Sequence, residues 1–346
     1  MSQPKMKIGM IGVGGFGGYR RARLRETGLF ELVACVDRNP AALESAQRED
    51  GARAVESVDQ LLAIPGLEGI VISTGVDSHV PLAVKAMDAG LHVFVEKPLC
   101  GKAEEIEIIR AARSRTGKVV GLGHSNNPTN PLVLSIQKVL QDGTLGTLVC
   151  YEENSSHSGG LEIQPGDWRG LRDRNPGGML LQCGVHSLHM LQHLFGPVQQ
   201  LSCMLRYDAN PNTQTADAAN VLLRHASGLV GTLNCYHVTA YYHELRLFGT
   251  KANLYIDTHT RAAHIQYRKR GPVEPREPFE MPFTADNGHS HANVTSWYRA
   301  IREGGSPDPS LEHGIAAVAP VFAAERSDET GQTVTLESAG EPARVA

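Results

Sequence analysis

The chain has 346 residues, of which 41% are hydrophobic and 20% charged, with a formal net charge of −4. This length suits two domains better than a single hydrophobic core. No basic stripe or long block of like charge is present, so the composition gives no reason to expect a nucleic-acid or membrane partner. No apolar run reaches the length of about 18 residues that a membrane-spanning helix needs.

Two features bear on the compartment. Residues 1–7 lead directly into an apolar, strand-like segment, without the apolar region, cleavage site or twin-arginine pair of an export signal. The cysteines form no C-x-x-C pair and no metal-ligand spacing, which is typical of reduced, buried cysteines. We therefore expect a cytoplasmic protein. The cysteines are Cys35, Cys100, Cys150, Cys183, Cys203 and Cys235.

The first 120 residues alternate short apolar runs with helical patterns, which predicts parallel strands joined by helices. We predict an α/β domain of Rossmann type over residues 1–125, and the motifs described below make it an NAD(P)-binding domain. The expected strands are 7–11, 31–36, 69–73, 92–95 and 118–121, and the expected helices are 18–27, 40–49, 58–63, 80–89 and 103–116.

The pattern changes after residue 125, where turn residues precede a run of strands joined by short links. We predict a second domain over residues 126–346, of α+β class, with a large, mainly antiparallel open sheet. The expected strands are 148–154, 198–207, 218–224, 229–237, 244–248, 252–256 and 264–267, and the expected helices are 132–141, 178–195, 291–303 and 311–326.

A glycine motif follows the first predicted strand. Residues 12–17 match G-x-G-x-x-G and precede the first helix, where such a loop brings a pyrophosphate to the helix N-terminus. Asp37 ends the second strand, 20 residues after Gly17 (37 − 17), and an acid there binds the adenosine ribose. The alternative is a glycine loop that only turns the chain. The predicted cofactor-binding residues of this region are Gly12, Gly14, Gly15, Phe16, Gly17, Asp37 and Arg38.

The same acid bears on the choice of cofactor. Asp37 would repel a 2′-phosphate and so favours NAD over NADP, whereas the neighbouring Arg38 could accommodate that phosphate. We predict NAD.

Beyond the fourth strand the chain carries Glu96-Lys97-Pro98. With this motif, the chain resembles the glucose–fructose oxidoreductase / inositol dehydrogenase / MocA family over nearly its whole length. The resemblance implies a Rossmann domain, a substrate-binding sheet domain, and a homo-oligomer (dimer or tetramer) formed through that sheet. It also adds Ser73, Thr74, His79, Glu96 and Lys97 to the cofactor site. The other matching segments are the glycine loop, Asp37, Trp168-Arg169, Gly177-Gly178 and Gly184-Val185-His186.

Lys97 is the predicted catalytic residue of the first domain. Ligands of parallel sheets lie outside the carboxyl ends of the strands, where Lys97 stands. A lysine there can take the proton of a substrate hydroxyl as hydride leaves the same carbon. The alternative is an ordinary surface lysine at a strand end.

The chain departs from the family at one position. In the polyol-oxidising members an aspartate stands four residues before the histidine that matches His186, and this chain has Gln182 there. Glutamine keeps hydrogen-bonding groups but cannot act as a base. The resemblance therefore implies that Lys97 and His186 handle the proton. The predicted substrate-binding residues are Gln182, Trp168, Arg169 and His157, and for Trp168-Arg169 the alternative is a core aromatic and a rim ion pair.

A histidine stripe raises the question of a metal. At about 100° per residue, four residues would share one helical face within roughly 60°. No carboxylate or cysteine completes a recognisable ligand set with them, so we predict no metal, and packing histidines are the alternative. The stripe is Gln182, His186, His189 and His193, and the further ligands considered are His157, His289 and His291.

The predicted function is that of an NAD-dependent oxidoreductase of carbohydrate metabolism, which takes hydride from a secondary hydroxyl of a sugar, cyclitol or derivative. Two alternatives stay open. An NAD-retaining glycosidase or lyase would use transient substrate oxidation, and Gln182 favours it. A non-catalytic dinucleotide sensor is the other, and the presence of Lys97 and His186 argues against it.

Overall fold

The computed structural model describes residues 4–124, 130–269, 274–282 and 289–336. The chain forms two compact units. The first comprises Met1–Ser125 and Gly288–Ile315, and the second comprises Asn126–Asn287 and Ala316–Ala346.

The first unit contains a six-stranded sheet in which every pair of neighbouring strands is parallel. Its order, β3-β2-β1-β4-β5-β6, is that of a dinucleotide-binding Rossmann fold, so the predicted fold class is confirmed. The strands are β1 (Met6–Ile11), β2 (Phe30–Val36), β3 (Arg53–Ala54), β4 (Gly69–Ile72), β5 (His92–Val95) and β6 (Val120–Leu122).

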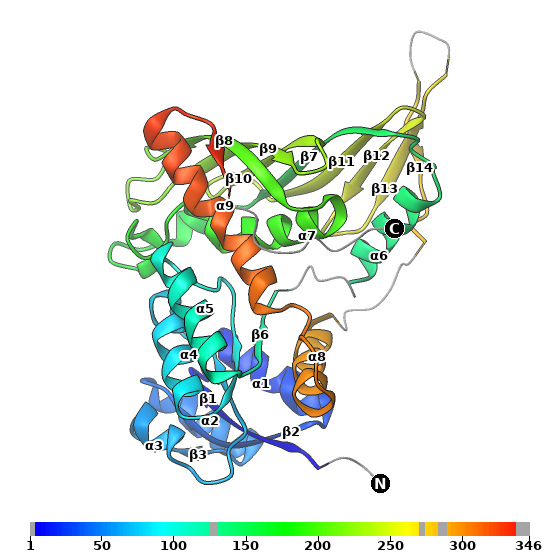
Figure 1. The fold of residues 1–346 in the computed structure, drawn as a ribbon. Coiled ribbons are helices and arrows are strands. Elements are labelled where there is room, and N and C mark those ends of the chain that lie inside the picture. The colour runs from blue at the N-terminus through cyan, green and yellow to red at the C-terminus, as the bar shows by residue number, and fades with distance from the viewer. Residues whose placement is uncertain (1–3, 125–129, 270–273, 283–288, 337–346) are drawn as a thin grey trace. The chain divides into compact units, whose positions relative to one another are not determined.

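Helices cover both faces of this sheet. Figure 1 shows α4 beside α5 on one side, and α1 beside α8 on the other. Local signals set several ends: the Asn39 side chain caps α2 ahead of Pro40, and Gly117 ends α5 in the left-handed conformation. The helices are α1 (Phe16–Thr27), α2 (Pro40–Asp50), α3 (Val58–Leu62), α4 (His79–Asp88), α5 (Glu104–Thr116) and α8 (His289–Glu303).

Residues 288–315 belong to the first unit, whereas the sequence placed them in the second domain. The reason is packing. Trp297 of α8 is completely buried, with its ring 5.9 Å from that of Phe30 and 5.7 Å from that of Phe94, measured between centroids. Gly69 and Gly121 leave room for the indole, since a Cβ on either would lie 2.8 Å from it. The Rossmann core is therefore completed by a segment far along the chain.

The second unit is built on a nine-stranded sheet, β14-β13-β12-β11-β7-β10-β9-β8-β15. Only β7 and β10 pair in parallel, so the predicted mainly antiparallel sheet is confirmed. The strands are β7 (Leu148–Ser156), β8 (Val198–Arg206), β9 (Ala218–His225), β10 (Val230–Tyr236), β11 (Tyr242–Gly249), β12 (Ala252–Asp257), β13 (Ala263–Tyr267), β14 (Glu277–Pro278) and β15 (Val334–Thr335).

The prediction of one α-helix over residues 178–195 is wrong in its first part. Leu180–Gly184 form a single π-turn, and α7 (Val185–Phe195) begins after it. Gly184 packs closely in this turn, because a Cβ there would lie 3.0 Å from the Cys235 sulfur. A π-turn holds more residues per turn than an α-helix, so side chains in it point in other directions than an α-helical wheel indicates. The other long helices are α6 (Pro131–Gln141) and α9 (Leu311–Thr330), which starts in the first unit.

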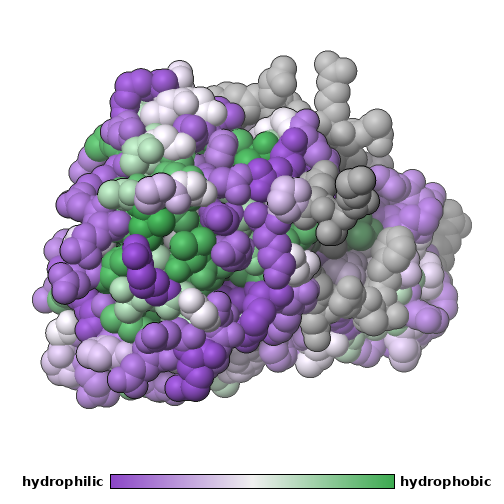
Figure 2. Space-filling view, turned by 90° about the horizontal axis from the view of Figure 1, so that it is seen from below, coloured by the Kyte–Doolittle hydropathy of each residue, from purple (hydrophilic) through white to green (hydrophobic). Residues whose placement is uncertain are grey.

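Hydrophilic side chains cover most of the face seen in Figure 2, with a smaller hydrophobic area among them. Within the described residues, no helix is long and apolar enough to cross a bilayer.

Candidate functional site

The phosphate loop joins β1 to α1 and depends on close backbone approach. Gly12 has a φ of 81°, and a Cβ there would lie 2.4 Å from the Ser73 carbonyl oxygen. A Cβ on Gly17 would lie 2.3 Å from the carbonyl oxygen of Gly12. Larger residues would force the loop apart, so the first and third glycines of the motif serve the packing that the sequence predicted.

The start of α1 is open to an anion. Gly15 is the N-cap residue, no side chain caps the helix, and its first turn contains no acidic residue. The N–H groups of Gly15 and Phe16 make no hydrogen bond within the described part of the chain. A pyrophosphate fits such a helix N-terminus, because free N–H groups and the helix dipole both favour negative charge.

Asp37 lies against the same loop. Its carboxylate accepts hydrogen bonds from the N–H groups of Val13 at 2.7 Å, Gly14 at 3.1 Å and Asn39 at 2.9 Å. Partial burial raises the pKa of Asp37, but these N–H groups lower it more, so the pKa lies below its ordinary value. The residue predicted to read the ribose therefore also holds the glycine loop, whereas Arg38 is exposed.

Glu96, at the carboxyl end of β5, is buried in an ion pair. Its Oε1 lies 2.5 Å from the Nε of Arg20, whose guanidinium sits 5.1 Å from the centre of the Phe94 ring. Arg20 belongs to α1, so the pair ties the helix that follows the phosphate loop to the strand that precedes Lys97. Sequence reasoning missed Arg20, since a helical arginine is normally exposed. A role for Glu96 in cofactor binding stays a prediction, and its contacts favour an indirect one.

Lys97 is half-buried and directly follows Glu96. A buried histidine, His79, holds the neighbouring loop. The His79 ring is buried, with Nδ1 2.8 Å from the Pro98 carbonyl oxygen and Nε2 3.1 Å from that of Thr74. Burial lowers the pKa of His79, against the opposing effect of the two carbonyls. His79 thus connects the loops after β4 and β5. Its predicted part in cofactor binding stays a prediction.

In the second unit, α7 carries His186 half-buried and His189 buried, while His193 Nε2 lies 2.8 Å from Gln137 Nε2 of α6. Gln182 lies in the π-turn that precedes α7, so the α-helical wheel that predicted the single stripe does not apply to it. Beside His186, the Ser187 hydroxyl donates to Glu153 of β7 at 2.8 Å. That bond fixes α7 against the sheet.

The π-turn brings Cys183 to His157, at the end of β7. His157 Nδ1 accepts the N–H of Gly159 at 2.8 Å, and its Nε2 lies 3.5 Å from the Cys183 sulfur. The His237 ring packs edge-on against His157, with 5.5 Å between centroids. The sequence identified Cys183 only as one of the reduced, buried cysteines, and His237 carried no signal of its own.

Trp168 and Arg169 lie together in a short 3-10 turn, Trp168–Gly170. The Arg169 guanidinium lies 5.1 Å from the Trp168 ring centre and forms an exposed ion pair with Asp167 at 3.2 Å. The rim ion pair considered from the sequence is therefore present. Substrate binding by Trp168 and Arg169 stays a prediction.

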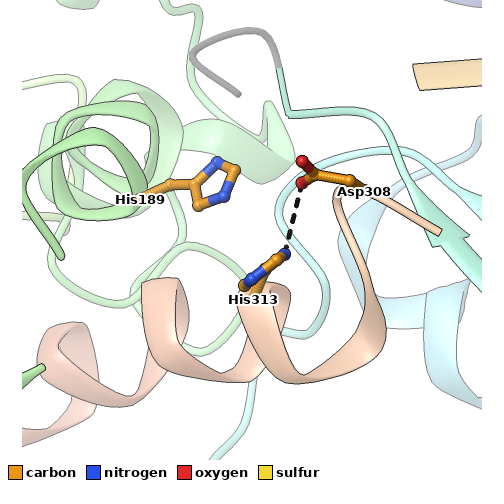
Figure 3. Close-up of side chains that lie close together, drawn as sticks. All are labelled: His189, Asp308 and His313. Carbon is orange, nitrogen blue, oxygen red and sulfur yellow. Dashed lines mark ion pairs between the residues drawn. The ribbon is translucent and has the colours of Figure 1, made fainter. Parts of the chain in front are cut away.

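Within each unit, no more than two of the described side chains that could bind a metal ion lie close enough together to share one. In the first unit, His313 Nδ1 lies 3.4 Å from Asp308 Oδ1 (Figure 3). His189, drawn in the same figure, belongs to α7 of the second unit. His291 pairs with Glu26 at 2.5 Å in the first unit, and the side chain of His289 lies outside the described residues. Taken separately, neither unit gathers three ligand side chains among its described residues, and the absence of a resident metal stays a prediction.

Comparison with known proteins agrees with this geometry. Residues 6–124 match the model for an oxidoreductase family with an NAD-binding Rossmann fold, and residues 133–255 match the GFO/IDH/MocA C-terminal domain. The chain is 26% identical over 329 residues to an inositol 2-dehydrogenase from Rhizobium meliloti, covering 93% of this chain and 96% of the relative.

Two solved structures show the same fold. An oxidoreductase from Desulfitobacterium hafniense, described as NADPH-dependent, has a TM-score of 0.86 and 22% identity, with coverage of 96% of this chain and 98% of that one. A levoglucosan dehydrogenase in complex with NADH has a TM-score of 0.83 and 18% identity, with coverage of 96% and 100%. The resemblance stated from the sequence is confirmed: the chain belongs to the Gfo/Idh/MocA oxidoreductase family, with an NAD-binding Rossmann domain at its N-terminus.

Proposed function

We propose that the protein is an NAD-dependent oxidoreductase that removes hydride from a secondary hydroxyl of a sugar, cyclitol or derivative. The observation that carries this proposal lies in the first unit. There the open N-terminus of α1, Asp37 and Lys97 all lie at the same edge of the parallel sheet. The relatives support the substrate class, because one is named as an inositol dehydrogenase and another as a levoglucosan dehydrogenase bound to NADH.

The chain's own residues would hold the dinucleotide by complementary charge. The N–H groups at the start of α1 suit the pyrophosphate, and the carboxylate of Asp37 suits the ribose hydroxyls. Ser73, Thr74 and Lys97 follow β4 and β5 at the same edge. When bound, NAD supplies the hydride acceptor.

The residues proposed for the proton are Lys97 and His186. The Lys97 amine takes the proton from the substrate hydroxyl as the C–H bond of the same carbon breaks, and His186 is the second residue proposed to handle that proton. Gln182 orients the substrate through its amide and carries no charge. Glu96 with Arg20, and His79, keep the Lys97 segment in place.

The test is stoichiometric. Purified protein with NAD and a panel of polyols should form NADH and a ketone in equal amounts. The second candidate, an NAD-retaining glycosidase or lyase, is favoured by the neutral Gln182. Substrate loss without free NADH would establish that candidate and overturn ours. Dinucleotide binding with no turnover at all would indicate a sensor.

We also propose a cytoplasmic homo-oligomer, a dimer or tetramer, assembled through the face of the second sheet that carries Met204 and Leu222. These side chains are 78% and 54% exposed, which is typical of an interaction surface. All six cysteines are free thiols, which suits a reducing compartment. Light scattering of the wild type and of Leu222→Asp tests the assembly: a mass of one chain for the wild type would contradict it.

A further inference from the structure

A cluster of imidazoles stands where β7 and β10 end in the second unit. The N–H of His157 donates to the carbonyl oxygen of Tyr236, so His157 and His237 leave these parallel strands at the same level. His243 of β11 pairs with Ser155, two residues before His157. We call His157, His237, His243 and the Cys183 thiol the imidazole cluster.

Geometry excludes a thiol–base pair in this cluster. His157 Nδ1 accepts the Gly159 N–H, so in the neutral ring Nε2 carries the proton and points it at the Cys183 sulfur. A general base would need a bare nitrogen facing the thiol. His157 therefore donates to Cys183 and cannot activate it as a nucleophile.

Two other rings present hydrogen-bonding atoms that the described residues do not use. The residue His237 is 3% exposed, and no hydrogen bond to its ring is found within the described ranges. His243 Nε2 is buried and likewise has no partner there. A buried polar atom without a partner is costly, so His243 Nε2 is suited to a hydrogen bond from a ligand, and the nitrogens of His237 are available for one as well.

The neutral form is favoured for two rings of the cluster, His237 and His243. Burial, together with His157 and Arg169, lowers the pKa of His237 to about 4. Burial also lowers the pKa of His243, with His157 and His259 adding to the shift and Asp257 opposing it. The arginine whose charge reaches His237, Arg169, is exposed and already paired with Asp167.

A neutral imidazole offers one donor and one acceptor, and a hydroxyl group can likewise both donate and accept, whereas a carboxylate or phosphate offers mainly acceptors. Beside the cluster, Tyr241 stacks on His243 with 4.5 Å between ring centroids, which provides an apolar surface for the C–H face of a sugar ring. Shape and polarity of the cluster thus match a ring that carries several hydroxyls.

We propose that the imidazole cluster recognises the hydroxyl groups of an uncharged sugar or cyclitol, and that the protein discriminates against phosphorylated or carboxylated forms of the same ring. The inference rests on the proposed function, because it assigns the substrate class of that oxidoreductase.

The first experiment compares matched probes in the presence of NAD: D-glucose and myo-inositol against D-glucose 6-phosphate and D-glucuronate. We expect kcat/KM for an uncharged probe to exceed that for the charged probes by about 100-fold or more, since each unmatched buried polar contact costs about tenfold or more. A preference for a charged probe overturns the inference and leaves the proposed function standing.

The second experiment does not need turnover. Iodoacetamide labels cysteines, and only Cys183 and Cys150 are not fully buried. With NADH present, myo-inositol or D-glucose should slow labelling of Cys183 and leave Cys150, on β7, unchanged as an internal control. Protection by D-glucose 6-phosphate alone, or by neither uncharged probe, overturns the inference. Protection by an uncharged probe that yields no NADH when NAD is supplied in the first experiment supports the cluster while overturning the proposed function.

Variants assign the effect to the cluster. His237→Phe removes both ring nitrogens at similar size and should raise KM for the uncharged probe about 10- to 100-fold, with kcat changed much less. His237→Gln restores a donor and an acceptor and should recover part of the loss. His264→Gln, on an exposed site of β13, is the control. Equal effects of His237→Phe and His264→Gln on KM would contradict the proposal.

Discussion

The two units bring their functional residues together in different ways. In the first unit most of the proposed recognition groups belong to the backbone, as glycine conformations and the N–H groups of one helix start, and one acid at a strand end adds its side chain. In the second unit the proposed groups are side chains that follow β7 and β10, belong to β11 or lie in a π-turn, and strand register places most of them. Recognition by backbone is local in the chain and leaves a motif, whereas recognition by side chains across a sheet leaves none.

The largest expected effect tests the proposed acid–base role of Lys97 in the first unit. Lys97→Ala should lower turnover by about 10² to 10⁴, the range for loss of a positioned acid–base group, while NADH affinity stays nearly unchanged. Steady-state kinetics and NADH titration measure both. Lys102→Ala, an exposed lysine five residues on, is the matched control. Lost NADH binding with intact turnover per bound cofactor would show that Lys97 only anchors the cofactor.

The next prediction compares the two tryptophans, one in each unit. Trp297→Ala should destabilise the first unit by about 3–5 kcal/mol, because it empties a fully buried site in the Rossmann core. Trp168→Ala, in the half-buried turn of the second unit, should lower the free energy of unfolding far less, by about 1 kcal/mol. Urea unfolding followed by circular dichroism measures both. Equal costs would mean that α8 is not an integral part of the first core.

Asp37 tests whether one residue has two roles. Asp37→Ala should weaken NADH binding about tenfold or more, because the ribose and the N–H groups of Val13 and Gly14 lose their acceptor. It should also narrow the preference for NADH over NADPH, by relieving repulsion of the 2′-phosphate. Fluorescence titration with both cofactors measures this, with Arg38→Ala as the comparison. A wild-type preference for NADPH would show that Arg38 decides instead.

A smaller effect depends on pH. Burial raises the pKa of Glu153 to about 8, against the Ser187 hydrogen bond, with Glu244 adding to the rise. The folded state therefore keeps a proton that the unfolded chain releases near the ordinary glutamate pKa of 4.5, so stability falls as pH rises between these two values. Glu153→Gln should abolish this fall in stability. Its free energy of unfolding should exceed that of the wild type by about 2 kcal/mol at about pH 9 and by little at about pH 5.

The control for that comparison lies on the same strand. Glu152 is exposed on the opposite face of β7 and pairs with Arg246, so Glu152→Gln should show no such pH-dependent gain. Urea unfolding across this pH range measures the three proteins. Parallel pH courses for wild type and Glu153→Gln would show that Glu153 is ionised throughout.

The smallest effect is expected at Gln182. If the protein is a simple dehydrogenase, Gln182→Asp should be tolerated within about threefold, and the pH–rate profile should shift upward because a carboxylate favours the imidazolium of His186. If it cleaves its substrate around a retained NAD, the added charge should lower activity, with no NADH accumulating in either form. Substrate loss and NADH absorbance, followed together across pH, separate these outcomes.

Local physical rules in the sequence determined much of the first unit. Gly12 and Gly17, Asp37 at a strand end, and Lys97 before a proline each follow from constraints within a few residues. The mainly antiparallel sheet was equally predictable, because its strands are joined by short links.

Tertiary structure alone decided the rest. Trp297 packs into the Rossmann core although it lies nearly 230 residues beyond Gly69 in the sequence (297 − 69). Only packing in three dimensions brings these two residues into contact. The π-turn interrupts, at Gln182 and Cys183, the α-helical period that the sequence suggests, and Gly184 packs closely against Cys235 within it. His157, His237 and His243 meet through the register of three strands, and register depends on pairing between distant segments that no local pattern encodes.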